Sequence, residues 1–417
     1  MTRRNSTGWA SNVLLGYRAA FGAPGAFSFS AAGFVARLPI AIYPIAIVLI
    51  VSGKTHSYGF AGVVSGSYVI GGAVGNPVAG VLVDRYGQHR MLPPFLAAHV
   101  ASVAAFGALV SSGAPHWMLL PPALLMGITL LNIGALVRAR WSYVWSDEPA
   151  RRSTAYSVES VLDELIFVIG PVIATVLATQ APPALTLGLA LMLLTGGSLW
   201  LATQRATEPG SAGAGSADRH DFALRYRGML LITWAMACMG AVFGSAEVVM
   251  VAFCGQHGQR GSAGWVVACF AGGSGVAGVL YGARHWVTPM LRRFVRSAVA
   301  FGALPLLFLL PTSVPALALC AGLVGLGIAP TLIAAFGLVD SIVPAASLTE
   351  GLTWIGTGLS VGYGLGTAVG GSFADQHGAH LAFSVPVGCA LAMAASAVAL
   401  AARLPNHAEQ RVVVAAA

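Results

Sequence analysis

The stretch "GVLVDRYGQHRML", residues 80–92, places a short charged turn between two long apolar segments. Gly80 would let neighbouring helices approach closely, and Gly87 would permit a tight turn. Asp84 stands at the end of the first apolar segment, where its carboxylate can meet a cation or a helix N-terminus. The stretch therefore predicts two membrane-spanning helices joined by a polar turn.

The composition of the whole chain agrees with a membrane protein. Of its 417 residues, 57% are hydrophobic and only 9% are charged, and its mean hydropathy is +0.78. Soluble globular proteins carry about 25% charged residues, so a soluble fold is excluded. No charged leader with a cleavage site precedes "FVARLPIAIYPIAIVLIV" (34–51), and we expect this first apolar stretch to be a retained span.

Glycine, proline and charged clusters divide the chain into twelve apolar stretches, each close to the roughly 20 residues that cross a bilayer. They lie near 28–51, 59–83, 92–111, 116–137, 155–179, 183–203, 228–253, 263–283, 297–311, 315–338, 350–372 and 381–402. The ninth is short, and we expect it to extend toward Arg292. The fold class predicted is an all-α polytopic membrane protein with twelve transmembrane helices.

The basic residues predict how the chain is oriented. Of the 22 lysines and arginines, Lys54 and Arg260 fall in outer loops and Arg37 falls inside a span, which leaves nineteen in the inner segments if both termini are cytoplasmic. This asymmetry follows the positive-inside rule. We therefore expect a multi-pass protein of a cytoplasmic (inner) membrane, whose net charge of +8 favours contact with anionic inner-leaflet lipid. No basic domain indicates a nucleic-acid partner.

A long polar segment divides the twelve spans into two sets of six. Residues 204–227 are rich in Gly, Ser and Ala and read as a flexible cytoplasmic linker between an N-terminal half (1–203) and a C-terminal half (228–417). The pentapeptide "VAGVL" ends the second span at 78–82 and the eighth at 276–280. Its recurrence at equivalent helix ends favours an internal duplication, with two pseudo-symmetric six-helix halves.

The turn at 80–92 resembles the signature of the major facilitator superfamily, G-x-L-x-D-R-x-G-x-x-R, in the loop between the second and third helices. The matching positions are Gly80, Leu82, Asp84, Arg85, Gly87 and Arg90. The resemblance implies a gating loop in which Asp84 latches the two halves near Ser347–Glu350. The second half has Gly282 where the acid would align, so the latch is expected to be one-sided.

The fifth span begins with "SVESVLDELIF" (157–167), which sets three acids in apolar sequence. Insertion of one central acid costs roughly 2.5–3.5 kcal/mol, so these acids need compensation. Arg37 and Asp163 both lie about 12–14 Å from the cytoplasmic ends of their spans, and the resemblance makes the first and fifth helices neighbours. We expect Arg37 to pair with Asp163 or Glu164, while Glu159 or the unpaired acid binds a proton. A static ion-pair network is the alternative.

Other residues are expected to shape a substrate path. The Gly170-Pro171 pair resembles part of a fifth-helix signature of proton-coupled exporters, and Pro171 should kink the helix. By the same resemblance, a second set would line a central cavity, although packing roles remain an alternative for each: Tyr43, Asn132, Trp234, Met236, Met239 and Thr331. Glu247 is expected near the outer interface, as a gate or cation-attracting site or as a water-exposed carboxylate.

Two other patterns favour packing over chemistry. Gly358, Gly362, Gly366 and Gly370 recur every four residues and predict a helix-packing ridge. His99 in the third span is interpreted as a packed histidine rather than a metal ligand, and no metal site is predicted. "GKT" (53–55) is not a P-loop, because Val48 stands where glycine is required. We expect no cofactor, with a proton gradient as the energy source.

The sequence therefore predicts a secondary active transporter and not an enzyme. The leading hypothesis, carried by the resemblance to bacterial drug/proton antiporters, is proton-coupled export of amphipathic small molecules by a monomer. Alternating access of the rocker-switch type would supply the mechanism. A proton-coupled uptake carrier or facilitator for a polar solute, and a non-transporting membrane receptor, remain alternatives.

Overall fold

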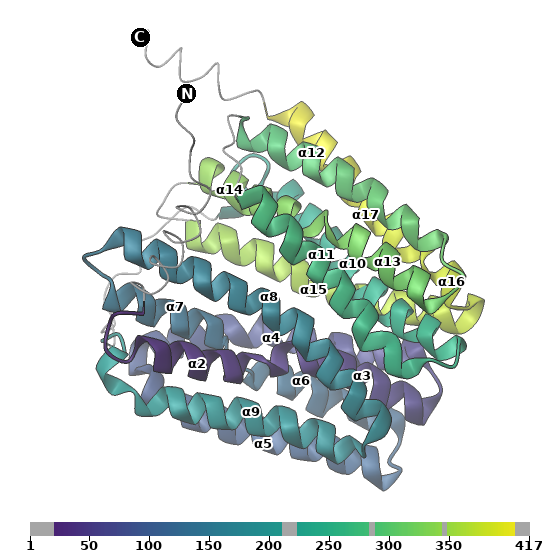
Figure 1. Ribbon diagram of the computed structural model, residues 1–417, viewed down its shortest axis with the longest axis horizontal. Coiled ribbons are helices and arrows are strands. Elements are labelled where there is room, and N and C mark those ends of the chain that lie inside the picture. The colour runs from purple at the N-terminus through teal and green to yellow at the C-terminus, as the bar shows by residue number, and fades with distance from the viewer. Residues whose placement is uncertain (1–20, 211–222, 283–287, 344–347, 405–417) are drawn as a thin grey trace, which may run out of the picture.

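The computed structural model describes residues 21–210, 223–282, 288–343 and 348–404. Every regular element within these ranges is a helix. Figure 1 shows the purple-to-teal helices of the first half packed together beside the green-to-yellow helices of the second. The all-α fold predicted from composition is confirmed for the described residues.

The first half contains nine helical elements in the described residues. They are α2 (Ala26–Arg37), α3 (Pro39–Thr55), α4 (Tyr58–Tyr86), α5 (Gln88–Ser112), η1 (His116–Leu119), α6 (Leu120–Thr129), α7 (Ile133–Val144), α8 (Pro149–Gln180) and α9 (Pro183–Thr203). The short helix η2 (Arg205–Thr207) follows α9.

The second half follows the segment 211–222, which lies outside the described residues. Its elements are η3 (Ala223–Arg225), α10 (Met229–Gln256), η4 (Arg260–Ser262), α11 (Ala263–Gly282), α12 (Met290–Ala303), η5 (Leu304–Leu309), α13 (Val314–Gly325), α14 (Ile328–Ile342), α15 (Leu348–His377), α16 (Ala379–Ala382) and α17 (Ser384–Arg403).

Several passes through the bundle are built from two or three consecutive helices, such as α2 with α3 and α6 with α7. Ten such stretches in the described residues are long and apolar enough to cross a membrane by length and composition. The α12–η5 pair and α15 complete twelve antiparallel passes. Because α12 begins at Met290, the expected extension of the ninth span toward Arg292 is confirmed.

Antiparallel passes give the bundle two ends, which we call the terminal end and the far end. The terminal end holds the start of α2, the α9–α10 connection and the end of α17, whereas the far end holds the turn between α3 and α4. Between the halves, the second pass (α4) packs on the eleventh (α15) and the fifth (α8) on the eighth (α11). In two duplicated halves the second pass corresponds to the eighth and the fifth to the eleventh. The two contacts are therefore equivalent, as expected for duplicated halves.

The predicted glycine ridge is confirmed where α15 meets α10. A methyl group on Gly362 would lie 1.8 Å from the carbonyl oxygen of Ala237, and one on Gly366 would lie 2.4 Å from that of Ala241. Missing side chains therefore let the two backbones touch, which maximises van der Waals contact between helices that gain little from hydrophobic association in lipid.

The two halves are closed against each other at the far end. A methyl group on Gly62 of α4 would lie 2.2 Å from the carbonyl oxygen of Thr367 in α15, and the Thr367 hydroxyl donates to the Gly62 carbonyl at 2.9 Å. At the tip, the Asp375 carboxylate accepts hydrogen bonds from the Ser57 hydroxyl (2.7 Å) and the backbone N–H groups of Tyr58 and Gly59 (2.8 and 2.7 Å). An acid of one half thus caps a helix of the other.

The same face of α4 is open at the terminal end. At 100° per residue, the face that carries Gly62 and Gly66 continues through Pro77 and Gly80, and both of these are exposed. A methyl group on Gly80 would meet no atom within 4 Å. The expectation that Gly80 provides a close helix approach is therefore wrong for this conformation, because the halves have parted there.

The start of the predicted linker is fixed to the first half. The buried Arg140 guanidinium donates to the Gln88 side chain (2.8 Å), the Gln204 carbonyl (2.7 Å) and the Thr207 hydroxyl (2.9 Å). Glu208 accepts from the His89 backbone N–H at 3.1 Å. Burial raises the pKa of Glu208, but the hydrogen bonds from His89 outweigh that effect and hold the pKa below its ordinary value.

The α10–α15 contact predicts a sharp difference between two glycines of the same helix. Gly362→Ala should lower the thermal unfolding temperature in detergent, because overpacking of this kind costs about 1–3 kcal/mol. Gly356→Ala is the matched control, since a methyl group there meets nothing within 4 Å and alanine favours helix formation. Equal unfolding temperatures for the two variants would show that α10 and α15 do not touch.

Candidate functional site

A break in the first pass sets an arginine inside the bundle. Pro39 has no backbone N–H and cannot continue the hydrogen bonding of α2, so α2 ends at Arg37 and α3 begins after Leu38. The Arg37 side chain is 5% exposed. Its Nε donates to the carbonyl oxygen of Gly33 at 3.0 Å, which holds the guanidinium against its own helix and aims the two remaining nitrogens outward.

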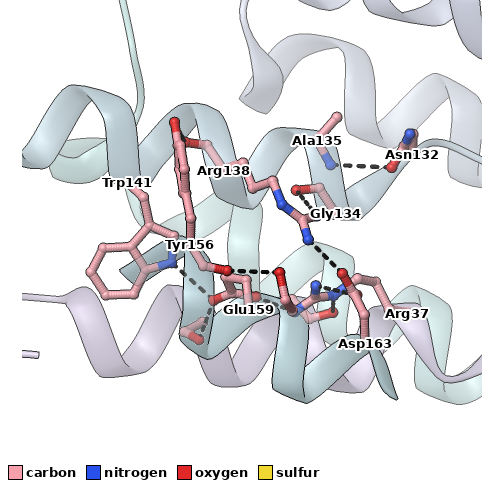
Figure 2. Close-up of polar contacts among 12 residues, drawn as sticks. Arg37, Asn132, Gly134, Ala135, Arg138, Trp141, Tyr156, Glu159 and Asp163 are labelled. Atoms are coloured by element: carbon pink, nitrogen blue, oxygen red, sulfur yellow. Dashed lines mark hydrogen bonds and ion pairs between the residues drawn. The ribbon is translucent and has the colours of Figure 1, made fainter. Parts of the chain in front are cut away.

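Arg37 binds two acids of the fifth pass. Its Nη2 donates to Glu159, and its Nη1 donates to Oδ1 of Asp163 at 2.7 Å. Glu159 and Asp163 are one helical turn apart on α8, so a single guanidinium reaches both. The structure thus brings together Arg37 and Asp163, as the depth argument expected, and adds Glu159 to the pair (Figure 2).

A second arginine, not anticipated as a partner, reaches the same acid from the fourth pass. Arg138 Nη2 donates to Oδ2 of Asp163 at 2.6 Å, and Figure 2 shows Arg37 and Arg138 meeting this carboxylate from different helices. No signal in the sequence indicated this contact, because Arg138 stands near the end of the fourth predicted span (116–137). It lies six residues before the end of α7, about 9 Å inside, which is close to the depth of Asp163.

The remaining oxygen of Glu159 is also satisfied. Its Oε1 accepts from the Ser30 hydroxyl at 2.6 Å and from Nε1 of Trp141 at 2.9 Å. Glu159 is fully buried, and Trp141 packs edge-on against Phe29. Neither Ser30 nor Trp141 was predicted, since a serine or tryptophan in a span gives no signal of its own.

The charge cluster, which we define as Arg37, Arg138, Glu159 and Asp163, is therefore neutral. Two guanidinium groups balance two carboxylates, and all four carboxylate oxygens accept hydrogen bonds. Charges buried without such partners carry a penalty of several kcal/mol per ion. The arrangement explains how this half tolerates four charged side chains among apolar helices.

Glu164 is the acid that the charge cluster leaves out. It has no hydrogen-bond or ion-pair partner within the part of the chain that the structure describes, and its side chain is half-buried. It faces the other half of the molecule, because a methyl group on Gly275 of α11 would lie 3.6 Å from its Oε2. A carboxyl group is thus held unpaired at the boundary between the two halves.

The second half holds another unbalanced acid. Glu247 on α10 accepts a hydrogen bond from the Tyr363 hydroxyl at 2.9 Å through Oε2, while its Oε1 is buried without a partner among the described residues. It lies nine residues, about 14 Å, before the far end of α10, which is deeper than the outer interface expected from the sequence. Ser65 and Tyr68 of α4 are neighbours of Tyr363 across the boundary.

The other predicted cavity residues separate into two groups. Asn132 and Trp234 are exposed, and Asn132 caps α7 by accepting from the Ala135 N–H at 3.1 Å. The remaining residues take the packing role that the sequence left open as the alternative, because other helices surround them completely in this conformation. These fully buried residues are Tyr43, Met236, Met239 and Thr331.

The buried histidine of the third pass has a structural environment. His99 Nε2 lies 3.2 Å from the Tyr43 hydroxyl, and Nδ1 lies 3.1 Å from the Thr129 hydroxyl. Both ring nitrogens are thus occupied by hydroxyl groups. No group of three or more His, Cys, Asp and Glu side chains arranged to hold a metal occurs among the described residues.

The predicted gating loop is described only in part. Gly87 adopts φ +91° between α4 and α5, as a tight turn requires. Arg85 lies over the ring of Tyr86 at 5.3 Å, and Arg90 is exposed. The partners of the predicted latch lie outside the described residues: the side chains of Asp84 and Glu350, and the whole of Ser347.

Pro171 lies inside α8, which runs on to Gln180. A methyl group on Gly264 of α11 would lie 2.3 Å from the Pro171 carbonyl oxygen. This position belongs to the far-end closure between α8 and α11.

Comparison with known proteins gives a consistent picture. A family model described as Major Facilitator Superfamily matches residues 29–258. No curated protein matches the chain. Three solved structures are similar to it over almost their whole lengths, although their sequence identities are low.

The first of these structures is the human organic anion transporter MFSD10 (TETRAN), with a TM-score of 0.62, 14% identity and coverage of 90% of this chain and 100% of that one. A point mutant of the nucleoside transporter NupG has a TM-score of 0.68, 12% identity and coverage of 90% and 99%. A bacterial homolog of the human lysosomal transporter Spinster, in an inward-facing and occupied conformation, has a TM-score of 0.66, 12% identity and coverage of 91% and 96%.

The geometry of the charge cluster predicts unequal roles for its two arginines. Arg37→Gln should lower the free energy of unfolding by about 3–5 kcal/mol, because it strips a buried partner from two acids. Arg138→Gln should lower the free energy of unfolding by less, because the side chains of Arg138 and Asp163 are 35% and 32% exposed and water can replace the lost contact. Thermal unfolding of the purified variants measures both.

A double variant controls for general disruption by the Arg37 substitution. Adding Glu159→Gln to Arg37→Gln should recover part of the stability, because the second change removes a carboxylate that the first left unpaired. The described pairing would be contradicted if Arg37→Gln and Arg138→Gln lowered the free energy of unfolding equally. Strictly additive effects of the two substitutions in the double variant would also contradict it.

Proposed function

The chain belongs to the major facilitator superfamily, and we propose that this secondary transporter exports amphipathic small molecules in exchange for protons. Family membership and the transporter fold support a multi-pass carrier of small molecules. Export, proton coupling and the substrate class are the proposed part. The observation that carries the proposal is an unpaired acid, Glu164, at the boundary between the halves beside a neutral charge cluster.

The conformation supports alternating access as the mechanism. The halves touch at the far end through Gly62, Thr367 and Asp375, while Pro77 and Gly80 on the same face of α4 are exposed at the terminal end. We take the terminal end to face the cytoplasm, in agreement with the distribution of basic residues. The described state then opens inward, and transport requires the terminal end to close as the far end opens.

Closure of the terminal end would change the environment of Glu164. In the open state its half-buried carboxylate retains access to water, and closure of α11 against α8 would remove that water. An unpaired carboxylate is costly to desolvate, so closure is favoured only when the charge is cancelled. A bound proton cancels it, and so does a positively charged group of a substrate.

This requirement is the thermodynamic condition for exchange. A carrier that closes with a proton or with a substrate, but not empty, couples the two fluxes in opposite directions. A proton that binds from outside would accompany the step that opens the terminal end. A bound substrate would accompany the reverse step, which closes the terminal end and opens the far end. The charge cluster would act as the fixed support of α8, because its carboxylates are already paired.

Glu247 is proposed as the second substrate contact. It is partly exposed, and Oε1 lacks a partner among the described residues while Tyr363 holds Oε2. A carboxylate with one free oxygen suits a ligand N–H donor. The exposed Asn132 and Trp234 extend the proposed path with an amide and an indole.

Flux through proteoliposomes under an imposed pH gradient tests the proposal. Glu164→Gln should lower proton-driven transport of amphipathic cations at least tenfold, because the amide can neither bind nor release a proton. Substrate exchange without a pH gradient should persist, since the amide is neutral as the protonated acid is. Glu148→Gln is the matched control, because Glu148 is an exposed acid that pairs with Arg151.

The outcomes separate the alternatives. Full pH-driven transport in Glu164→Gln, and also in Glu159→Gln and Asp163→Asn, would remove the proton-coupling role from this helix. Substrate movement in the same direction as the protons would favour an uptake carrier. Zero flux of cationic, anionic and neutral compounds through folded protein would favour a receptor.

A further inference from the structure

The far end contains a recess of about 570 Å³ between the first half and a loop of the second. Its lining comes from the ends of α3, α5 and α8, the start of α9 and the short helix η4. The volume falls within the range of small-molecule sites, about 300–1,000 Å³. No residue to which the proposed transport function assigns a role lines this recess.

Both basic residues assigned to outer loops meet in this recess. Lys54 reaches it from the last turn of α3, and Arg260 reaches it from η4 of the other half. A methyl group on Gly53 would lie 3.8 and 3.9 Å from the two terminal nitrogens of Arg260, so the guanidinium lies against the residue that precedes Lys54. Two cationic side chains, one from each half, thus line the same recess.

The local acids do not balance these two cations. None of the residues that line the recess is acidic. Among the described ion pairs, neither Lys54 nor Arg260 has a carboxylate partner. Asp375 also lies at the far end, and it already accepts three hydrogen bonds at the start of α4.

Arg260 is positioned by neutral groups among the described residues. Its Nη2 donates to the Ser52 hydroxyl at 2.7 Å and lies 3.5 Å from the Leu49 carbonyl oxygen, while its Nε is buried without a partner there. A guanidinium whose donors are incompletely used favours an oxyanion that can accept two parallel hydrogen bonds, such as a carboxylate or a phosphate. Lys54 is exposed and can move onto the same ligand.

Apart from Gly53 and the hydroxyl residues Ser111 and Thr179, the rest of the lining is apolar and comes from the far ends of the helices. Leu49, Ile50, Val110, Ala178 and Pro183 form this part. A ligand that fills the recess therefore needs an anionic head and a hydrocarbon body. Such chemistry occurs in soluble organic phosphates and carboxylates and in anionic phospholipids.

We propose that the recess binds an amphipathic anion through Lys54 and Arg260. One bound head group then links α3 of the first half to η4 of the second. Because this link exists only while the far end is closed, the anion stabilises the inward-opening state. The recess is thus an inhibitory site, separate from the path that contains Glu164 and Glu247, and its inhibitory effect rests on the proposed transport function.

Binding can be measured without transport, by calorimetry on the protein in phosphatidylcholine nanodiscs. Octyl phosphate is the probe, and octyl glucoside is the neutral control with the same chain. The wild-type protein should bind octyl phosphate at least tenfold more tightly than it binds octyl glucoside. Lys54→Gln should weaken phosphate binding about three- to tenfold, since one of two cations is lost, and leave octyl glucoside unchanged.

Two further variants complete the test. Lys54→Gln with Arg260→Gln should bind both amphiphiles equally, and the control Arg403→Gln, an exposed arginine at the terminal end, should behave as wild type. If the Arg260 variant fails to fold, the single Lys54 variant decides, because Lys54 is exposed. Equal binding of octyl phosphate by wild type and Lys54→Gln would overturn the proposal, as would the absence of any preference over octyl glucoside.

A change in the lipid composition of the nanodiscs distinguishes a phospholipid from a soluble anion as the ligand. Phosphatidylglycerol nanodiscs that abolish octyl phosphate binding would identify a phospholipid as the occupant, and unchanged binding would identify a soluble anion. In proteoliposomes, octyl phosphate should slow substrate exchange at least threefold in the wild type and not in Lys54→Gln. Equal slowing in both would overturn the inhibitory role, and failure of proton coupling would not affect the binding result.

Discussion

The mutual cancellation of buried charge is the constraint on which this structure depends. Asp163 sits between Arg37 and Arg138, and Glu159 shares Arg37 with it. Charges in an apolar bundle are tolerated when they are paired and fully hydrogen-bonded. The neutral charge cluster fixes the first, fourth and fifth passes relative to one another, and it thereby determines which acid is left over for chemistry.

Small residues supply the second constraint, because they let backbones meet where lipid offers little hydrophobic drive. One side of α15 packs on α10 through Gly362 and Gly366, and another side packs on α4 around Gly62. Asp375 adds three hydrogen bonds across the far end. Of these contacts, only those between α4 and α15 join the two halves, and at the tip they are hydrogen bonds that water can replace.

Much of the fold follows from sequence, because apolar length, glycine spacing and basic asymmetry are local properties. Matching depths, together with the neighbouring first and fifth helices that the family resemblance implies, anticipated a contact of Arg37 with Asp163 or Glu164. The roles of Arg138 and Trp141 were missed, since the break at Asn132 sets the rotation and depth of α7 and no local pattern reports it. The sequence left open whether Met236 and Met239 line a cavity or pack between helices for a related reason: a span's apolar side chains do not reveal which face meets another helix. Asp375 reads as an ordinary helix-end acid until α4 is placed beside it.

The central claim is that a proton on the fifth pass changes which end of the bundle is open. Electron spin resonance distances test it, with spin labels at Tyr86 and Asp340 for the terminal end and at Ser112 and Leu310 for the far end, all exposed, in a background without the five native cysteines. As pH falls, the account predicts that the terminal pair shortens while the far pair lengthens, and that Glu164→Gln holds the low-pH distances at every pH. Distances that do not change with pH would contradict the account, as would terminal and far distances that both shorten or both lengthen.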